Sequence, residues 1–305
     1  MAGSQDFEPD PRNQSVLVFV NGELVLREEA KVSIFDAGFS MGDGVWEGIR
    51  LHKGALLFLD AHLDRLMAGL EAIGMAGQLD RMSLEAALWR TLDANDMEDG
   101  VHIRLMVTRG FKTTASQDPR NAVGRPTLVI TAEHKRPARR PGGLALALVE
   151  ARCTPPEMFD MRLNSHSRLP LILALNQAIA VGADEALMLD PAGCVATCNA
   201  TNFFFVAGGK VQTSSGRFGF AGITRGNVIA LCAQNAIDCE QGDFPPEALE
   251  SADEAFVTGT MGGIAPVARI DGHFFPEPPG PLTRRMGALY ADLVDAEAAL
   301  HKRHR

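Results

Sequence analysis

The chain has 305 residues, a length that fits two domains or one large one, and 46% of them are hydrophobic, enough for a sizeable core. The net charge of −9 argues against a general nucleic-acid binder. The chain has five cysteines, an odd number, and no CxxC pair. We therefore expect reduced cysteines in a cytoplasmic protein, and no metal site. The sequence shows no basic start followed by an apolar run, and no apolar run long enough to span a membrane. We therefore expect neither a signal peptide nor a membrane-spanning segment.

The first part of the chain predicts a flexible tail at residues 1–14 and a small α/β domain at 15–133. Asn21-Gly22 lies between two short apolar runs, which is typical of a β-hairpin. We expect a glycine-punctuated loop at 36–44, and Ser83 as the N-cap of the second helix. The apolar spacing predicts further strands at about 45–51, 55–59, 101–108 and 126–131, and helices at about 60–73 and 83–92.

Residues 134–143 are rich in Pro, Arg and Gly and predict a linker, which leaves 144–305 for a larger second domain. Ser167 and Thr224 are the expected N-caps of the first two of its helices. The expected strands of this domain are 144–151, 185–189, 202–207, 210–213 and 254–258, and the expected helices are 169–181, 224–237 and 282–300.

The stretch Gly222–Asn227 reads as a loop that turns into a helix. The first turn of a helix has unpaired backbone N–H groups and the positive end of the dipole, so it favours phosphate. A second small turn, Thr258-Gly259-Thr260, also carries hydroxyl groups. Each turn alone is weak evidence, and an ordinary capped helix is the alternative, but the two turns could meet on one anion.

Several stretches, taken in order and spacing, resemble the class IV aminotransferases, the fold-type-IV pyridoxal-phosphate enzymes. That family includes branched-chain and D-amino acid aminotransferases and aminodeoxychorismate lyases. The resemblance implies an α/β fold of two domains with the ligand in the cleft between them, and a homodimer. The similar stretches are FSMGDGVWEGIR at 39–50, HLDRL at 62–66, GADEAL at 182–187, NFF at 202–204, GITR at 222–225, and ADEAF at 252–256 followed by TGT at 258–260.

The resemblance also implies a cofactor, pyridoxal 5'-phosphate or pyridoxamine 5'-phosphate, and residues that hold it. Arg65 would pair with its phosphate, Ile223 and Thr224 would donate backbone and hydroxyl hydrogen bonds, and Thr260 would add another. One guanidinium, one helix terminus and two hydroxyl groups suit a dianion. The alternative for Arg65 is a solvated helix residue.

Two positions depart from the family pattern. The family binds its cofactor covalently through a lysine at the position that is Asn164 here, or Leu163 if the loop is one residue longer, and neither has an amine. We therefore expect non-covalent binding and slow or absent ordinary transamination. Thr197 stands where the family has a glutamate beside the pyridine nitrogen. A hydroxyl group can hydrogen-bond that nitrogen, but it cannot stabilise the positive charge.

His166 is the one side chain near Asn164 suited to proton transfer near neutral pH, although it could instead hydrogen-bond the helix cap. Arg168 is either structural or directed at the cofactor. Lys112 is the only plausible replacement amine, and the alternative for it is a solvated loop lysine. Three functions remain open: an enzyme on an amino or keto acid in which His166 moves protons, a non-catalytic binder of a phosphate ligand, and a lyase or other enzyme on the same scaffold.

Overall fold

The computed structural model describes residues 6–137 and 142–303, and the chain separates into two compact units. Within the described residues, the N-terminal unit comprises 8–136, 164–168 and 296–303, and the C-terminal unit comprises the remainder. The middle of the expected 134–143 linker, residues 138–141, lies outside the described residues.

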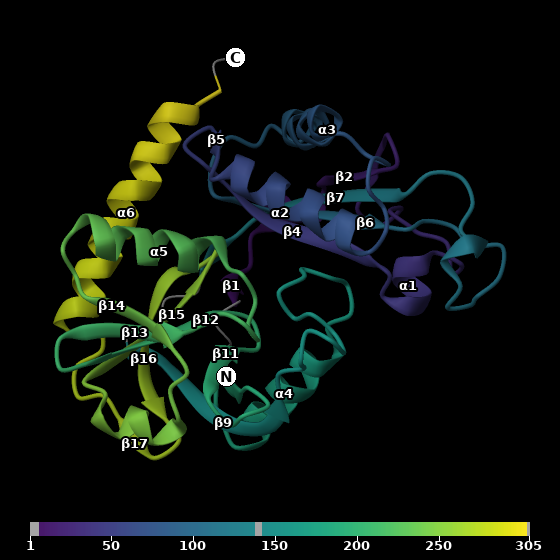
Figure 1. Ribbon diagram of the computed structural model, residues 1–305. Helices are drawn as coiled ribbons and strands as arrows, with labels where there is room; N and C mark the ends of the chain where they lie inside the picture. The colour runs from purple at the N-terminus through teal and green to yellow at the C-terminus, as the bar shows by residue number, and fades with distance from the viewer. Residues whose placement is uncertain (1–5, 138–141, 304–305) are drawn as a thin grey trace. The chain divides into compact units, whose positions relative to one another are not determined.

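A six-stranded antiparallel sheet in the order β3-β2-β7-β6-β4-β5 forms the N-terminal unit (Figure 1). The hairpin expected at Asn21-Gly22 is confirmed, because both residues have the positive φ that turns β2 back onto β3. The strands of the sheet are β2 (Leu17–Val20), β3 (Glu23–Leu26), β4 (Gly44–His52), β5 (Ala55–Leu56), β6 (Val101–Thr108) and β7 (Thr127–His134), and the helices of the unit are α1 (Ala37–Met41), α2 (Leu59–Ala72) and α3 (Arg81–Ala94).

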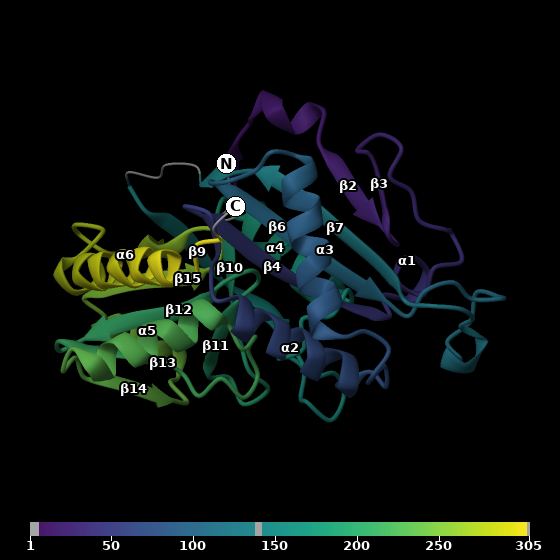
Figure 2. The ribbon, with the colours of Figure 1, turned by 90° about the horizontal axis from the view of Figure 1, so that it is seen from above.

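Helices α2 and α3 cover one face of this sheet (Figure 2). Leu63, Leu66 and Leu70 recur at helical spacing on α2 and are buried in one cluster with Val45 of β4. Gly69 allows a close approach, since a Cβ atom there would lie 3.2 Å from Cγ1 of Val45. The apolar stripe that predicts the helix in the sequence is therefore the face that the helix buries.

A mixed sheet of nine strands, counted among the described residues, forms the C-terminal unit in the order β11-β10-β9-β16-β15-β12-β13-β14, with β17 paired to β16. Helix α4 packs on β9 and β10, and α5 packs on β14 and β15. The strands are β9 (Leu144–Arg152), β10 (Glu185–Leu189), β11 (Val195–Cys198), β12 (Asn202–Ala207), β13 (Lys210–Ser214), β14 (Cys239–Gly242), β15 (Glu254–Gly259), β16 (Gly263–Ile270) and β17 (His273–Phe274), and the helices are α4 (Leu169–Ala180), α5 (Ile223–Gln234) and α6 (Pro281–His301).

The remaining short elements are strands β1 (Phe7–Glu8) and β8 (Arg136–Pro137), which pair, and three 3-10 helices: η1 (Pro11–Gln14), η2 (Pro119–Asn121) and η3 (Pro246–Ser251). The expectation of a loose tail fails at η1. The Asn13 side chain is buried there and exchanges two hydrogen bonds with the backbone of His134, at 2.8 and 2.9 Å. Sequence composition gives no sign of this long-range contact.

Several helix starts also differ from the sequence expectation. Residues 37–41 form α1 because the Asp36 side chain caps it at the Gly38 N–H group, so the expected loop is partly helical. Asp80, rather than Ser83, caps α3 and accepts from the Ser83 N–H group. Gly222, rather than Thr224, is the N-cap of α5.

Residues 164–168 belong to the N-terminal unit, although the segments on either side of them belong to the C-terminal unit. The segment lies antiparallel to the start of β4: the Trp46 N–H group donates to the Asn164 carbonyl at 2.9 Å, and the His166 N–H group donates to the Gly44 carbonyl at 2.9 Å. The Ser167 hydroxyl donates to the Gly42 carbonyl rather than capping α4. This pairing places Asn164 and His166 beside β4 of the six-stranded sheet.

Candidate functional site

Arg65 is held by a buried carboxylate in the N-terminal unit. Its Nε and Nη2 atoms donate to the two oxygens of Glu47 at 2.8 and 2.6 Å, and Nδ1 of His62 lies 2.7 Å from Oε2 of Glu47. Glu47 is 0% exposed and His62 is 1% exposed. Burial opposes the charge of Glu47, but the hydrogen bonds from Arg65 and His62 outweigh it and hold the Glu47 pKa below its usual value.

Burial also lowers the pKa of His62, so this imidazole is neutral at neutral pH and donates Nδ1–H to Glu47. The Glu47 carboxylate of β4 therefore accepts from two donors on α2, His62 and Arg65. These contacts set the position and orientation of the Arg65 guanidinium. Arg65 is thus a partly buried ion-pair residue, not the solvated helix residue of the alternative interpretation.

Asn164 makes its side-chain contact with an arginine. Its Oδ1 atom accepts a hydrogen bond from Nη2 of Arg168, four residues further along the chain. The Arg168 guanidinium lies over the Trp46 ring with Cζ 5.2 Å from the centroid, and Arg104 of β6 lies over the same ring at 4.1 Å. The sequence therefore places an amide at this position, and the structure places a cationic cluster around it.

The Nε2 atom of His166 is buried and has no hydrogen-bond partner among the described residues. In the tautomer that carries its proton on Nδ1, this Nε2 atom has a free lone pair. Burial and then Arg104 lower the His166 pKa, so the neutral form dominates near pH 7. A neutral imidazole with an unpartnered Nε2 can accept a proton.

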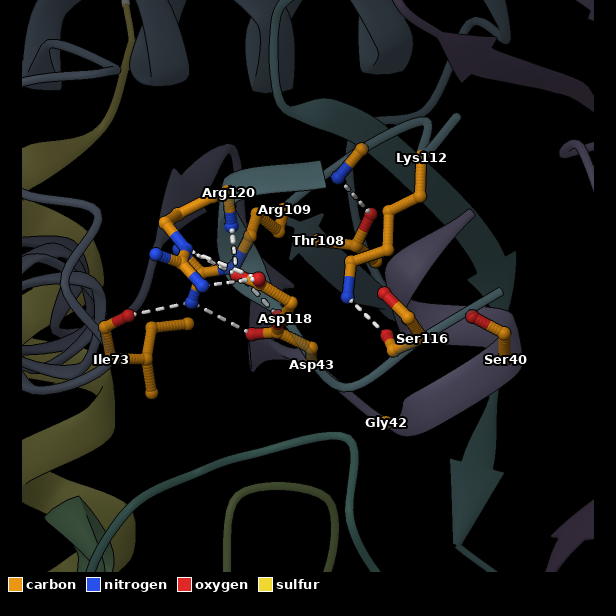
Figure 3. A network of polar contacts seen from close by, with 12 residues as sticks. Ser40, Gly42, Asp43, Ile73, Thr108, Arg109, Lys112, Ser116, Asp118 and Arg120 are labelled. Carbon is orange, nitrogen blue, oxygen red and sulfur yellow. Dashed lines mark hydrogen bonds and ion pairs between the residues drawn. The ribbon is translucent and has the colours of Figure 1, made fainter. Parts of the chain in front are cut away.

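Lys112 is buried, so the alternative of a solvated loop lysine is wrong. Its side chain is 1% exposed and its Nζ atom donates to the Ser116 carbonyl at 2.7 Å (Figure 3). The loop that carries it is closed by a bridge between Lys112 and Ala122. Figure 3 also shows Arg109, whose guanidinium donates to Asp43 at 2.6 and 3.0 Å. In this structure the Lys112 ammonium group has a structural contact within its own loop.

In the C-terminal unit, the first turn of α5 carries two of the residues expected to bind an anion, Ile223 and Thr224. A Cβ atom at Gly222 would collide with Oδ1 of Asn202, whose Nδ2 donates to the Phe220 carbonyl at 2.8 Å. The side chain of Asn202 therefore fits the loop only because residue 222 is a glycine. Ile223 begins the helix, and Thr224 is buried in its first turn. The backbone N–H groups at such a terminus suit a phosphate.

Tyr290 brings the two hydroxyl-bearing turns together. Its phenol oxygen lies 3.4 Å from Oγ1 of Thr224, and a Cβ atom at Gly263 would lie 3.2 Å from its ring. Gly263 closes the turn that contains Thr260, because Gly259 and Gly263 pair across the end of β15 and β16. The start of α5 and the Thr260 turn therefore meet at one tyrosine, the only tyrosine in the chain.

A nearby hydroxyl group fits a further polar ligand. Oγ1 of Thr258, at the end of β15, is buried and has no partner among the described residues. An unsatisfied buried hydroxyl group costs free energy unless an unseen partner completes it. The residues at the start of α5 and the end of β15 therefore fit a phosphate group.

Thr197 is buried in β11, where its hydroxyl group donates to the Thr201 carbonyl at 3.0 Å. The Thr201 hydroxyl in turn donates to the Glu185 carboxylate at 2.6 Å. The Thr197 hydroxyl proton is therefore already used in a hydrogen bond within the protein. To donate to a ligand nitrogen, the hydroxyl group would have to break its bond to the Thr201 carbonyl.

The candidate residues thus fall in both units: Arg65, Asn164 and His166 in the first, and Thr197, Ile223, Thr224 and Thr260 in the second. Sequence reasoning missed the partners that orient them: Glu47, Trp46, Arg104 and Tyr290. Glu47 and Trp46 lie within the 39–50 stretch that carries the resemblance, so they could have been examined there. Arg104 and Tyr290 have no local signal, because they meet their partners through sheet pairing and helix packing.

The described residues hold no group of three or more His, Cys, Asp or Glu side chains that could bind a metal ion. Among the helices of the described residues, none combines the length and apolar character that a membrane crossing requires.

Comparison with known proteins identifies the family. Residues 44–270 match the family model described as amino-transferase class IV, so the chain belongs to the class IV aminotransferases. It is 38% identical to a branched-chain-amino-acid aminotransferase-like protein 2 of Arabidopsis thaliana, over 94% of this chain and 52% of that protein. The chain spans about half the length of the two Arabidopsis relatives that it matches. It is also 33% identical to a putative branched-chain-amino-acid aminotransferase of Methanocaldococcus jannaschii, over 90% of this chain and 96% of that protein.

Solved structures agree with this assignment. The branched-chain aminotransferase of Thermoproteus uzoniensis with norvaline has a TM-score of 0.83 and 28% identity, covering 94% of this chain and 97% of that one. A second branched-chain amino acid aminotransferase, solved with pyridoxamine 5'-phosphate, has a TM-score of 0.86 and 26% identity, covering 94% of this chain and 96% of that one. The α/β fold of the class IV aminotransferases, expected from the sequence, is therefore confirmed.

Proposed function

We propose that the chain binds pyridoxal 5'-phosphate or pyridoxamine 5'-phosphate non-covalently and acts on an amino or keto acid. The observation that carries the proposal is the contact of Asn164: at the position where the resemblance puts a covalently bound lysine, an amide is held by Arg168. An amide can hydrogen-bond a cofactor but cannot form a covalent link with it. The solved relative with bound pyridoxamine 5'-phosphate supports the identity of the cofactor.

Ile223, Thr224 and Thr260 are the residues we propose as phosphate ligands in the C-terminal unit. The backbone N–H groups at the start of α5 and the buried hydroxyl group of Thr224 are donors around one point, as phosphate recognition requires. Arg65 is proposed as a further phosphate partner, and Glu47 and His62 fix its guanidinium for that purpose. Thr197 is proposed to face the pyridine nitrogen.

When bound, the cofactor supplies an electron-accepting ring for chemistry at the α-carbon of an amino acid. His166 is the residue we propose to move protons, because its Nε2 atom is buried and has no hydrogen-bond partner among the described residues. Thr197 offers a hydroxyl group instead of a carboxylate, so it does not stabilise a protonated ring nitrogen by charge. Ordinary transamination is therefore expected to be slow or absent.

The second candidate is a non-catalytic binder of a phosphate ligand, favoured by the same missing amine at Asn164; a lyase on this scaffold is a variant of the first candidate. The two differ in one observable. An enzyme with bound cofactor changes its absorbance when the productive amino acid is added, and this change slows in His166→Gln. A binder shows cofactor absorbance that no amino acid alters.

A homodimer is proposed from the resemblance and from exposed apolar side chains. Ile34, just before α1, and Phe39, within α1, are each 69% exposed in the single chain. Helix α4 also has exposed apolar side chains at Leu169, Ile172 and Leu173. Exposed apolar patches of this kind mark interaction surfaces. Sedimentation should give a dimer at micromolar concentration, and a monomer would contradict the proposal.

Covalent trapping tests the cofactor proposal. Wild-type protein is loaded with pyridoxal phosphate, treated with borohydride, denatured and weighed by mass spectrometry. We expect no adduct in wild type, an adduct in Asn164→Lys, and none in Asn164→Gln, the matched control that keeps an amide. An adduct in wild type that disappears in Lys112→Ala would show a conventional enzyme with a relocated lysine. Failure of wild type to bind pyridoxal phosphate would reject the proposed cofactor.

A further inference from the structure

Two arginine side chains share one aromatic ring in the N-terminal unit. Arg104 and Arg168 have Cζ atoms 4.1 and 5.2 Å from the Trp46 ring centroid. The ring is fixed by its own Nε1–H group, which donates to the Ser165 carbonyl at 3.1 Å. Guanidinium groups gain from an aromatic face, but two of them on one ring repel each other. The arrangement therefore has an unfavourable term that an anion would relieve.

Burial and neighbouring charges both act on these two guanidinium groups. Burial, followed by the charges of Arg104 and Arg65, lowers the Arg168 pKa to about 10, and the charge of Glu47 opposes the shift by less. Burial also lowers the Arg104 pKa, with Glu133 acting in the opposite direction. In both cases the local environment disfavours the positive charge in the ligand-free protein.

Both carboxylates are engaged elsewhere. Glu47 accepts from Arg65 and His62 at 2.6 to 2.8 Å. Glu133 lies 2.8 Å from the Lys135 ammonium group and 3.1 Å from Arg27. The two carboxylates that act on Arg168 and Arg104 therefore each have other cationic partners as well.

Asn164 helps to fix the orientation of the Arg168 guanidinium group. Its Oδ1 atom accepts from Nη2 of Arg168, and the Cζ atom of Arg168 lies 5.2 Å from the centroid of the Trp46 ring. A guanidinium group held by two contacts loses little further freedom when it binds a planar anion. Such a fork matches a carboxylate bidentately, which a lysine ammonium group cannot do.

We infer that Arg168, held by Asn164 and by the Trp46 ring, recognises a carboxylate of the substrate, with Arg104 adding a second positive charge on the same ring. The inference rests on the proposed function, because the carboxylate is that of the amino or keto acid. It gives Asn164 a role as a positioning residue for the guanidinium. The amide at this position then contributes to substrate binding as well as lacking an amine.

Trp46 can report this binding directly. The chain has two tryptophans, so Trp89→Phe leaves Trp46 as the only one. In that background, fluorescence is titrated with sodium propionate and, separately, with sodium phosphate. Pyridoxal phosphate affinity is measured in parallel by absorbance. We expect a saturable response to propionate that is stronger than the response to phosphate.

Arg168→Gln should weaken propionate binding by roughly tenfold or more, since a charged hydrogen-bond donor is lost, while pyridoxal phosphate affinity stays within about twofold. Arg168→Lys should fall between, because it keeps the charge without the fork. Arg90→Gln is the matched control: Arg90 lies over the Phe19 ring at 5.7 Å in the same unit, and its loss should leave propionate binding unchanged.

Three results would overturn the inference: unchanged propionate affinity in Arg168→Gln, an equal response to propionate and phosphate, or no response of Trp46 in wild type. If Arg168→Gln does not fold, as judged by thermal unfolding, Asn164→Ala decides the matter. That variant keeps the guanidinium but releases it, and should weaken propionate binding roughly threefold. A normal propionate response in protein that fails to bind pyridoxal phosphate would reject the proposed function and leave the carboxylate site standing.

Discussion

Glu47 and Arg65 form a two-point ion pair inside the N-terminal unit, with both oxygens of the carboxylate accepting from the guanidinium at 2.6 and 2.8 Å. His62 donates to the same carboxylate from the neighbouring turn of α2. A guanidinium oriented in this way is already placed before any ligand arrives. The ion pair therefore contributes to the stability of the unit and also orients Arg65, which we propose binds the cofactor phosphate.

Glu47→Gln should destabilise the protein by about 3 kcal/mol, because removing one partner of a buried ion pair leaves the other charge uncompensated. Urea unfolding measures the change. Asp43→Asn is the matched control, since it breaks another two-point ion pair, that of Asp43 with Arg109. The Arg109 and Asp43 side chains are 12% and 21% exposed, so this change should destabilise the protein by less. Equal costs for the two variants would show that the burial of Glu47 is energetically unimportant.

Lys112→Ala should cost about 2 kcal/mol, because it removes a buried aliphatic chain and the bond from Nζ to the Ser116 carbonyl. A solvated lysine would change stability by less than about 0.5 kcal/mol. Thermal unfolding distinguishes these values. Lys53→Ala serves as the comparison on an exposed turn of the same unit. A neutral Lys112→Ala would contradict the burial of this side chain.

Thr224→Val should lower pyridoxal phosphate affinity roughly tenfold while the fold is retained, since it removes one hydroxyl group from the start of α5. Tyr290→Phe should have a smaller effect, because its phenol contacts Thr224 at 3.4 Å without being a proposed ligand. Equilibrium titration followed by absorbance gives both affinities. The proposed phosphate site fails if Thr224→Val binds the cofactor as wild type does.

Stability should fall as pH decreases from about 6.5 towards 4, and His102 should account for part of the loss. Burial, followed by the charges of Lys135 and Arg104, lowers the His102 pKa from 6.5 to about 4. The unfolded chain therefore takes up a proton at pH values where the folded chain does not, so acid favours unfolding over that window. The contribution is at most about 3 kcal/mol.

His102→Gln should reduce this pH dependence without abolishing it. Urea unfolding at pH 7 and pH 5 provides the comparison between wild type and variant. Glu47 acts in a lower range: its pKa is depressed in the folded state, so its contribution is present above about 4.5 and is lost as the pH falls below that value. An identical slope between pH 7 and pH 5 in wild type and His102→Gln would contradict the assignment.

Local chemistry let the sequence alone predict many of the elements. The Asn21-Gly22 hairpin, the α2 stripe of Leu63, Leu66 and Leu70, and the strand at 101–108 follow from turn preference and apolar periodicity, which act over a few residues. Motif order predicted the family that the comparisons identify, and it led to the prediction that Asn164 stands at the lysine position. Helix starts were less certain, because several residues near Gly222 and Asp80 can act as caps.

Only the tertiary structure determined how the site residues are oriented. The pairing of 164–168 with β4 brings Asn164, Arg168 and Trp46 together, and Trp46 is more than a hundred residues away along the chain. Tyr290 reaches Thr224 only through the packing of α6, and Lys112 is buried and bonded to the Ser116 carbonyl rather than solvated. Such contacts depend on long-range pairing and burial, which residue spacing does not encode. The sequence therefore determined which residue types the site contains, and the tertiary structure decided which of them hold one another in place.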